Sequence, residues 1–293
     1  MAGIPGWFMA MVQATVMLVA FAVGLSASGA DHGALLRRPR LLFKALLAVL
    51  VLTPTIAVLL VKGVQPPAAI GVGILIASLS IGPVAALKNS KKLGPERDIA
   101  VGMNVLFLCL SVVFVPVAVF LVGLAFRRVL HLGAGEVASA ILPLQLAPLF
   151  AGLAVGRLAP RFVARIEKRF TQLTNLALVL VAIAIIVLLF DKLVGLGGRA
   201  WVLIATFAAM SMLVGHALGG PEPGTRNVLA TFSALRFPAL GIVISRVAEN
   251  KEAIVVVLAY VLCSLTMVLI YLAVERSARG DEPVEPHAPP HGV

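Results

Sequence analysis

The sequence predicts an all-α polytopic membrane protein, and three observations support this fold class. The chain has 293 residues, of which 60% are hydrophobic and only 13% are charged, and its mean hydropathy is +1.06. Several apolar runs approach the ~20 residues that a helix needs to cross ~30 Å of hydrocarbon. Alternating strand patterns are absent, so the spans are predicted to be helices and not the strands of a barrel. No soluble core of this chain length could bury so much apolar surface.

Hydropathy predicts about nine transmembrane helices. They are Trp7–Ser28, Leu41–Val61, Pro67–Leu87, Ile99–Phe126, Val137–Leu158, Leu173–Phe190, Ala200–Leu218, Asn227–Val247 and Ala253–Val274. The first run lacks a basic leading segment and is longer than the apolar part of a signal peptide, so it is predicted to be a retained helix. Residues 279–293 are polar and rich in proline, which predicts a disordered cytoplasmic tail behind a single transmembrane domain, residues 1–278.

The basic residues predict how the chain is oriented in the membrane. Sixteen of the 24 Lys and Arg residues fall in loops on one side of the predicted spans, seven fall on the other, and Arg236 belongs to neither. By the positive-inside rule the richer side is cytoplasmic, so the N-terminus is outside and the C-terminus is inside. These short loops also account for the net charge of +11, so we expect a lipid bilayer and no nucleic acid as the partner. The basic segment Arg157–Leu173 is predicted to form a short amphipathic helix at the cytoplasmic surface.

Two spans carry an interruption in an otherwise apolar run. The third contains Ile81-Gly82-Pro83, and the eighth contains "TFSALRFPALG" with Arg236 two residues before Pro238. Proline lacks a backbone donor and disfavours helix in the residue before it, so both places are predicted helix breaks. The other prolines within spans are expected only to kink their helices; they are Pro54, Pro116, Pro143 and Pro148.

The positions of the two breaks predict an inverted repeat. Each broken span is the third of four, in repeats at about 7–126 and 171–276, and the fifth helix, about 137–158, lies between them. The second repeat therefore enters the membrane from the opposite face. Paired broken helices of this kind cross near the bilayer midplane, where transporters usually bind their substrate.

The chain resembles the bile acid:sodium symporter family. The resemblance is carried by the order of spans, by "SLSIGPVAALKNSKKLGPERDIAVGMNVLFLCLSVVFVPVAVFL" and by "GGPEPGTRNVLATFSALRFPALGIVISR", and it extends over nearly the whole chain. It implies a core domain in which two broken helices cross and a panel domain against which the core moves, with the first, fifth and sixth spans as panel elements. The resemblance and the short loops also imply a bacterial inner membrane as the location.

The sequence departs from this family at the residues expected to hold sodium. Sodium-coupled members resemble one another in having small polar residues and an asparagine after the first break, and a glutamate followed by a glutamine at the second. Those oxygens suit a hard cation. Here no hydroxyl or amide follows Gly82 and Pro83 directly, and an ungapped alignment puts Phe232 at the glutamate and Arg236 at the glutamine. We expect no metal site and no cofactor, and sodium held by backbone carbonyls and Asn104 stays an alternative.

Three interpretations of Arg236 stay open. An arginine at the bilayer centre costs roughly 2.5–3.5 kcal/mol on insertion scales, so it normally faces the interior of the bundle or water. Arg236 either braces the break by donating to carbonyls of the third or fourth span, or binds an anionic substrate, or lies at the interface because the span is shifted in register. Other residues could line the crossing or the gap between core and panel, although each polar one could instead bond a nearby helix; they are Ser80, Gly82, Pro83, Asn104, Ser233, Pro238 and Gln145.

The predicted function is secondary transport of an organic anion, a carboxylate or a sulfonate, by alternating access and without sodium coupling. One alternative is sodium-coupled symport of bile-acid-like or pantoate-like anions, and another is a membrane sensor or scaffold that does not transport. An enzyme is not expected, because no catalytic grouping of Ser, His, Cys, Asp or Glu lies inside the spans. The sequence does not set the substrate, the direction of transport or the oligomeric state.

Overall fold

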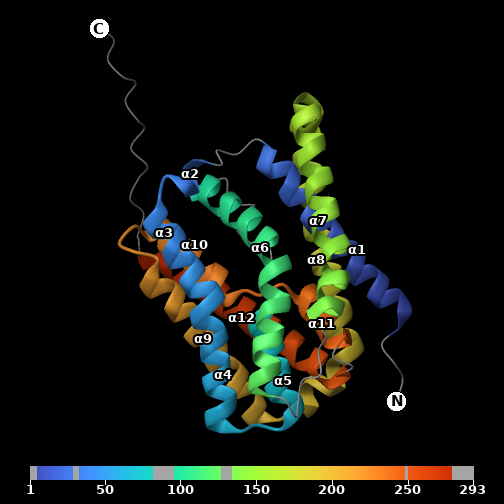
Figure 1. Ribbon diagram of the computed structural model, residues 1–293, viewed down its shortest axis with the longest axis vertical. Helices are drawn as coiled ribbons and strands as arrows, with labels where there is room; N and C mark the ends of the chain where they lie inside the picture. Colours follow the sequence, from blue (N-terminus) through green and yellow to red (C-terminus); the bar gives the residue numbers. More distant parts are fainter. Residues whose placement is uncertain (1–4, 29–32, 82–95, 127–133, 248–249, 279–293) are drawn as a thin grey trace.

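The computed structural model describes residues 5–28, 33–81, 96–126, 134–247 and 250–278. Every regular element in this part of the chain is a helix (Figure 1), which confirms the predicted all-α class. In chain order the helices are α1 (Gly6–Ser28), α2 (Gly33–Leu36), α3 (Pro39–Leu46), the π-helix η1 (Leu47–Leu52), α4 (Thr53–Val64), α5 (Ala68–Leu79), α6 (Glu96–Ala125), α7 (Ala134–Leu158), α8 (Pro160–Gly195), α9 (Gly198–Leu218), α10 (Pro223–Ala234), α11 (Pro238–Val247) and α12 (Lys251–Ala278).

Seven helical segments of the described chain are long and apolar enough to cross a membrane. They are Gly6–Ala27, Pro39–Val64, Asp98–Ala125, Gly135–Leu158, Arg169–Val194, Gly198–Leu218 and Glu252–Glu275. The two other predicted spans are the interrupted ones: α5 ends after 12 residues, and α10 and α11 are separate helices of 12 and 10 residues. The polytopic membrane class is thus confirmed, while the count of nine spans and the inverted repeat stay predictions.

The basic segment before the sixth span does not form a helix of its own, contrary to the prediction. It is the first part of α8, which runs for 36 residues from Pro160 to Gly195. Ala159 has non-helical backbone angles and Pro160 follows it, so the chain turns there. No further proline or glycine separates the basic stretch from the apolar one, and the helix therefore continues. In Figure 1 the end of the molecule where α7 meets α8 projects beyond the other helices.

The prolines within the described spans fall into two groups. Pro116 lies inside α6, and Pro143 and Pro148 lie inside α7, and both helices continue past them. Pro54 differs, because it occupies the first turn of α4 directly after the π-helix η1. That π turn was not predicted from the sequence.

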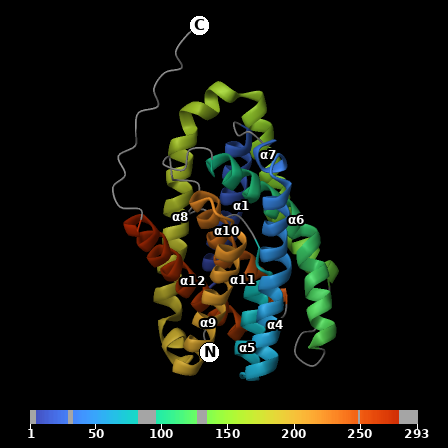
Figure 2. The same cartoon turned by 90° about the vertical axis from the view of Figure 1, so that its left-hand side faces the viewer.

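The helices pack as two groups. α1 packs along α7 and also against α8. A Cβ added to Gly24 of α1 would collide with the carbonyl oxygen of Leu149, and one added to Gly152 of α7 would collide with that of Phe21, so these two backbones are in direct contact. The second group is built from α5, α9, α10, α11 and α12, with α12 contacting each of the other four. Figures 1 and 2 show α1, α7 and α8 as a layer beside the others.

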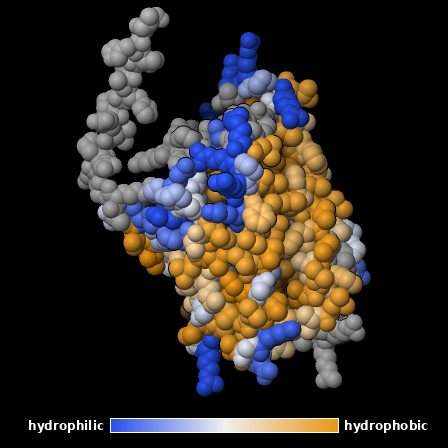
Figure 3. All heavy atoms as spheres, turned by 60° about the vertical axis from the view of Figure 1, so that its left-hand side comes forward, coloured by the Kyte–Doolittle hydropathy of each residue, from blue (hydrophilic) through white to orange (hydrophobic). Residues whose placement is uncertain are grey.

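The surface matches a chain that lies in a bilayer. Figure 3 shows a broad hydrophobic band with hydrophilic atoms gathered at its two ends. The exposed side chains of this band include large apolar residues on several helices; examples are Val113, Phe120, Phe150, Val187 and Leu213. Hydrocarbon is the solvent that such a surface requires.

Candidate functional site at the helix crossing

The end of α5 meets the connection between α10 and α11 in the interior of the protein. The backbone N–H of Phe237, between α10 and α11, donates a hydrogen bond of 2.9 Å to the carbonyl oxygen of Ser80, directly after α5. This bond joins residues that are far apart in the sequence and that lie where the third and eighth spans are interrupted. Each helix end has backbone groups without a partner in its own helix, and the crossing lets one end satisfy the other.

Proline sets the break between α10 and α11. Leu235 has an extended backbone, with φ −76° and ψ 132°, so the α10 helix ends at Ala234. Pro238 is the first residue of α11, the position where its missing N–H costs nothing and its fixed φ suits a helix. Arg236 is therefore held in a short non-helical connection between two helices, as predicted.

Arg236 is buried at this connection, with 5% of its surface exposed. Its Nη2 lies 3.5 Å from the carbonyl oxygen of Val49, and its Nε and Nη1 have no hydrogen-bond partner among the described residues. It forms no ion pair with another described residue either. This burial places Arg236 among other protein groups, while its depth in the membrane stays a prediction. The long contact of Arg236 is to the Val49 carbonyl in the second span. The bracing interpretation expected a carbonyl of the third or fourth span.

The π-helix leaves the carbonyl of Val49, which accepts from Arg236, without a partner in its own helix. In η1 the N–H of Thr53 bonds the carbonyl of Ala48, five residues back instead of four. The next donor in that register, for the Val49 carbonyl, would be the N–H of Pro54, which proline lacks. Val49 therefore presents an acceptor to its surroundings, at the kind of π-bulge that often accompanies a functional site.

Tyr260 of α12 is a member of this site that the sequence interpretation missed. Its side chain is completely buried, and its hydroxyl donates a 2.6 Å hydrogen bond to the carbonyl oxygen of Ala234, at the end of α10. The hydroxyl also interacts electrostatically with the Arg236 guanidinium. The available signal was that Tyr260 is one of only two tyrosines in the chain and lies inside an apolar span, where a hydroxyl needs a partner.

The structure brings some of the predicted residues together and not others. Ser80 and Pro238 flank the crossing, although the Ser80 hydroxyl bonds the carbonyl of Ile76 in its own helix. The Ser233 hydroxyl lies against Gly215 of α9. Gln145 of α7 accepts a 2.8 Å hydrogen bond from Ser111 of α6.

Two other features of the prediction concern the first break and α6. Gly82 and Pro83 lie outside the described residues, so the structure places neither of them. Asn104 is buried on α6, one turn before Phe107. Phe107 in turn packs against Phe232 of α10, with 5.6 Å between the ring centroids. An apolar pair thus occupies the position that the alignment gave to a sodium-binding glutamate.

The arrangement suits recognition of an anion. A guanidinium has five N–H donors in a planar fork, and a carboxylate or a sulfonate can accept two of them together. At Arg236 one long hydrogen bond uses one of these donors. No group of three or more His, Cys, Asp or Glu side chains in the described chain could hold a metal ion.

Comparison with known proteins gives the family. The model of the Sodium Bile acid symporter family matches residues 14–196, more than half of the chain, from α1 to the end of α8. Arg236 and helices α9 to α12 follow the matched residues. No curated protein matches the chain. The protein belongs to the sodium bile acid symporter family.

Proposed function

We propose that the protein is a secondary transporter that binds a small organic anion, a carboxylate or a sulfonate, at Arg236 and moves it by alternating access without sodium. Membership of a family of organic-anion transporters supports the general activity. The finer statements rest on the contact between the end of α5 and the connection from α10 to α11. The observation that carries them is a buried guanidinium with two nitrogens that lack a partner among the described residues.

The cost of burying Arg236 supports an anionic ligand. A charged group removed from water loses several kcal/mol of hydration, and an isolated charge needs a partner to recover it. The contact to the Val49 carbonyl, at 3.5 Å, is at the outer limit of a hydrogen bond. A bound carboxylate or sulfonate would supply opposite charge and accept from the remaining donors.

The same charge argues against sodium at this place. A sodium ion about 5 Å from the guanidinium would be repelled by about 3 kcal/mol at an effective dielectric constant of 20. Phe232, at the position aligned with the glutamate, packs on an aromatic ring and supplies no oxygen ligand. In this proposal Arg236 holds the place of the coupling cation and also attracts the substrate.

The proposal is tested by measuring anion binding and transport after the positive charge of Arg236 is removed. Purified wild type and Arg236→Gln would be compared for thermal stabilisation by cholate and taurocholate, with sodium or potassium as the only cation, and for uptake of the stabilising anion into proteoliposomes. We expect stabilisation and flux by the wild type in both cations, and a fall of about 100-fold in affinity for Arg236→Gln. Arg199→Gln is the matched control, because Arg199 is exposed at the start of α9.

Each alternative gives a different result in this test. Stabilisation and flux of the wild type only in sodium would establish ordinary sodium symport. Binding that depends on Arg236 without flux in either cation would indicate a sensor on a transporter fold. If Arg236→Gln binds and transports the anion like the wild type, Arg236 has only a structural role.

A further inference from the structure

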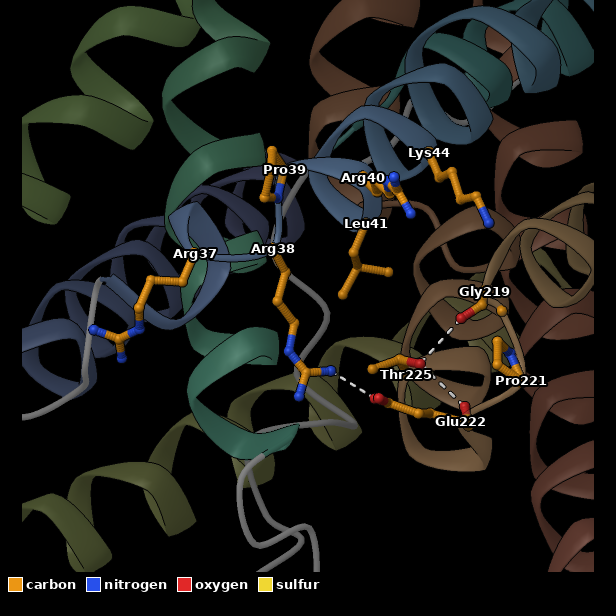
Figure 4. A pocket seen from close by; sticks show the side chains of 11 residues that line it. Arg37, Arg38, Pro39, Arg40, Leu41, Lys44, Gly219, Pro221, Glu222 and Thr225 are labelled. Atoms are coloured by element: carbon orange, nitrogen blue, oxygen red, sulfur yellow. Dashed lines mark hydrogen bonds and ion pairs between the residues drawn. The ribbon is translucent and has the colours of Figure 1, made fainter.

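A basic pocket lies at one end of the molecule, away from the helix crossing. It has a volume of about 560 Å³ and lies between the start of α3 and the connection from α9 to α10 (Figure 4). Four basic side chains line it, Arg37, Arg38, Arg40 and Lys44, with a single acidic one, Glu222. This is the end of the molecule that the distribution of Lys and Arg predicts to be cytoplasmic.

The pocket carries an excess of positive charge. Arg38 pairs with Glu222 at 2.5 Å, whereas Arg40 and Lys44 have no acidic partner among the described residues. In Figure 4 these two side chains extend on the side of Gly219, while Arg37 extends away from Glu222. The first turn of α10 also faces the pocket through Thr225, and the N-terminal end of a helix adds a partial positive charge.

Apolar side chains beside the pocket place it at the edge of the bilayer. Leu36 of α2 is 69% exposed and Phe43 of α3 is 66% exposed. Phe43 lies one turn after Arg40 on the same helix, and that helix is the first part of the candidate membrane span Pro39–Val64. Exposed cations followed at once by exposed apolar side chains match the junction between lipid headgroups and acyl chains.

We propose that this pocket binds the phosphate of an anionic glycerophospholipid from the adjoining leaflet, with Arg40 and Lys44 as its principal contacts. Basic pockets between transmembrane helices at the cytoplasmic surface suit such headgroups because the negative lipid and the positive pocket meet at the same depth. A volume of about 560 Å³ accommodates a phosphodiester with its glycerol. The acyl chains would lie along the exposed side chains of Leu36 and Phe43.

The pocket is separate from the proposed anion site, so this inference stands without it. α10 starts at the pocket and ends next to Arg236, and its 12 residues correspond to about 18 Å. Buried apolar side chains fill the space along this helix; among them are Ala45, Ala48, Val228, Leu229 and Phe232. An anion in the pocket therefore does not contact Arg236.

Lipid binding can be tested on the full-length protein in detergent. The protein would be titrated with phosphatidylglycerol or phosphatidylcholine, and bound lipid would be counted by native mass spectrometry. The test variant combines Arg40→Gln with Lys44→Gln. The control combines Lys192→Gln with Arg199→Gln, which removes the same charge from exposed positions where α8 ends and α9 begins.

We expect the wild type and the control to prefer phosphatidylglycerol, and the test variant to bind it roughly 30-fold more weakly. Equal binding by the test variant and the wild type would overturn the proposal. If inorganic phosphate displaces phosphatidylglycerol at comparable concentration, a soluble phosphate is the ligand and the lipid assignment is wrong. If the wild type binds phosphatidylglycerol only after deletion of residues 281–293, which contain Asp281, Glu282 and Glu285, the acidic tail is the occupant.

Discussion

An arginine lies near each end of α10, and the two differ in their exposure and in their acidic partners. Arg226, in the first turn, lies 3.5 Å from Glu275 of α12, and both side chains are partly exposed. Beside it Tyr271 donates to Asn227 at 2.8 Å and lies 2.8 Å from His216. Arg236, two residues after the last turn, is buried and has no acidic partner in the described chain.

The difference is the reverse of what stability alone requires. Water can solvate Arg226, so its ion pair with Glu275 adds little stability. A buried charge such as that of Arg236 has much more need of a partner of opposite charge. Among the described residues, an acidic side chain pairs with the partly exposed arginine and none pairs with the buried one. In the proposed function, an anion that arrives from solution and leaves again would take the place of this acid.

The largest effect on the difference between the two arginines is expected when the side chains of sodium-coupled relatives are introduced beside Arg236. The double variant Phe232→Glu with Arg236→Gln exchanges the fixed cation for oxygen ligands. We expect sodium to stabilise this variant by about 2.7 kcal/mol when its concentration is 100 times Kd, and not to stabilise the wild type. Thermal unfolding in sodium against potassium measures it, with Phe232→Glu alone as the control for the lost contact to Phe107. A wild type stabilised equally by sodium would show that the oxygen ligands lie elsewhere.

A second variant tests how tightly the crossing is assembled. A Cβ added to Gly241 of α11 would lie 2.6 Å from Val257 and 2.9 Å from the Ser80 hydroxyl. Gly241→Ala should push α11 away from α12 and from the end of α5, and lower the free energy of unfolding by about 1–3 kcal/mol. Gly195→Ala is the matched control, because nothing lies within 4 Å of its added Cβ. Equal thermal midpoints for the two variants would contradict close contact at the crossing.

Removing the Tyr260 hydroxyl should have a smaller effect. Tyr260→Phe leaves the Ala234 carbonyl without its 2.6 Å donor and keeps the contact of the ring to Phe207. We expect a loss of about 1–2 kcal/mol in thermal unfolding, together with weaker anion binding because Arg236 loses a polar neighbour. Unchanged binding with lowered stability would make Tyr260 a structural support only.

The smallest effect is expected at the other end of α10. Arg226→Gln breaks a partly exposed ion pair with Glu275 and should change stability by less than about 1 kcal/mol. Anion affinity should stay within about twofold of the wild type, against the large loss predicted for Arg236→Gln. Equal losses of affinity in Arg226→Gln and Arg236→Gln would remove the distinction between the two arginines.

Much of the fold could be predicted because apolar runs and prolines act locally. The spans follow from hydropathy, and the end of α10 follows from Pro238, since proline constrains its own residue and the one before it. The predicted boundary near Leu173, between the basic segment and the sixth span, was wrong. No residue after Pro160 stops the helix, so the two segments are one element.

The site was predictable in its centre but not in its surroundings. Arg236 could be found as a charge in an apolar run. Its contacts join the connection between α10 and α11 to Val49 of η1 and Tyr260 of α12, and no local pattern fixes such contacts. Pro54 predicts a free carbonyl upstream, but whether that carbonyl lies four or five residues back depends on the π turn, which the sequence did not predict.

The fixed charge of Arg236 would also decide which part of a transport cycle feels the membrane voltage. With a monovalent anion bound, the site is electrically neutral and can be reoriented without electrical work. An empty site bears one positive charge, and moving that charge through the full potential involves ~2.3 kcal/mol per 100 mV. A negative interior would oppose the empty site moving outward, whereas a second anion would neutralise it for the return. A carrier built in this way exchanges one anion for another more readily than it moves a single anion alone.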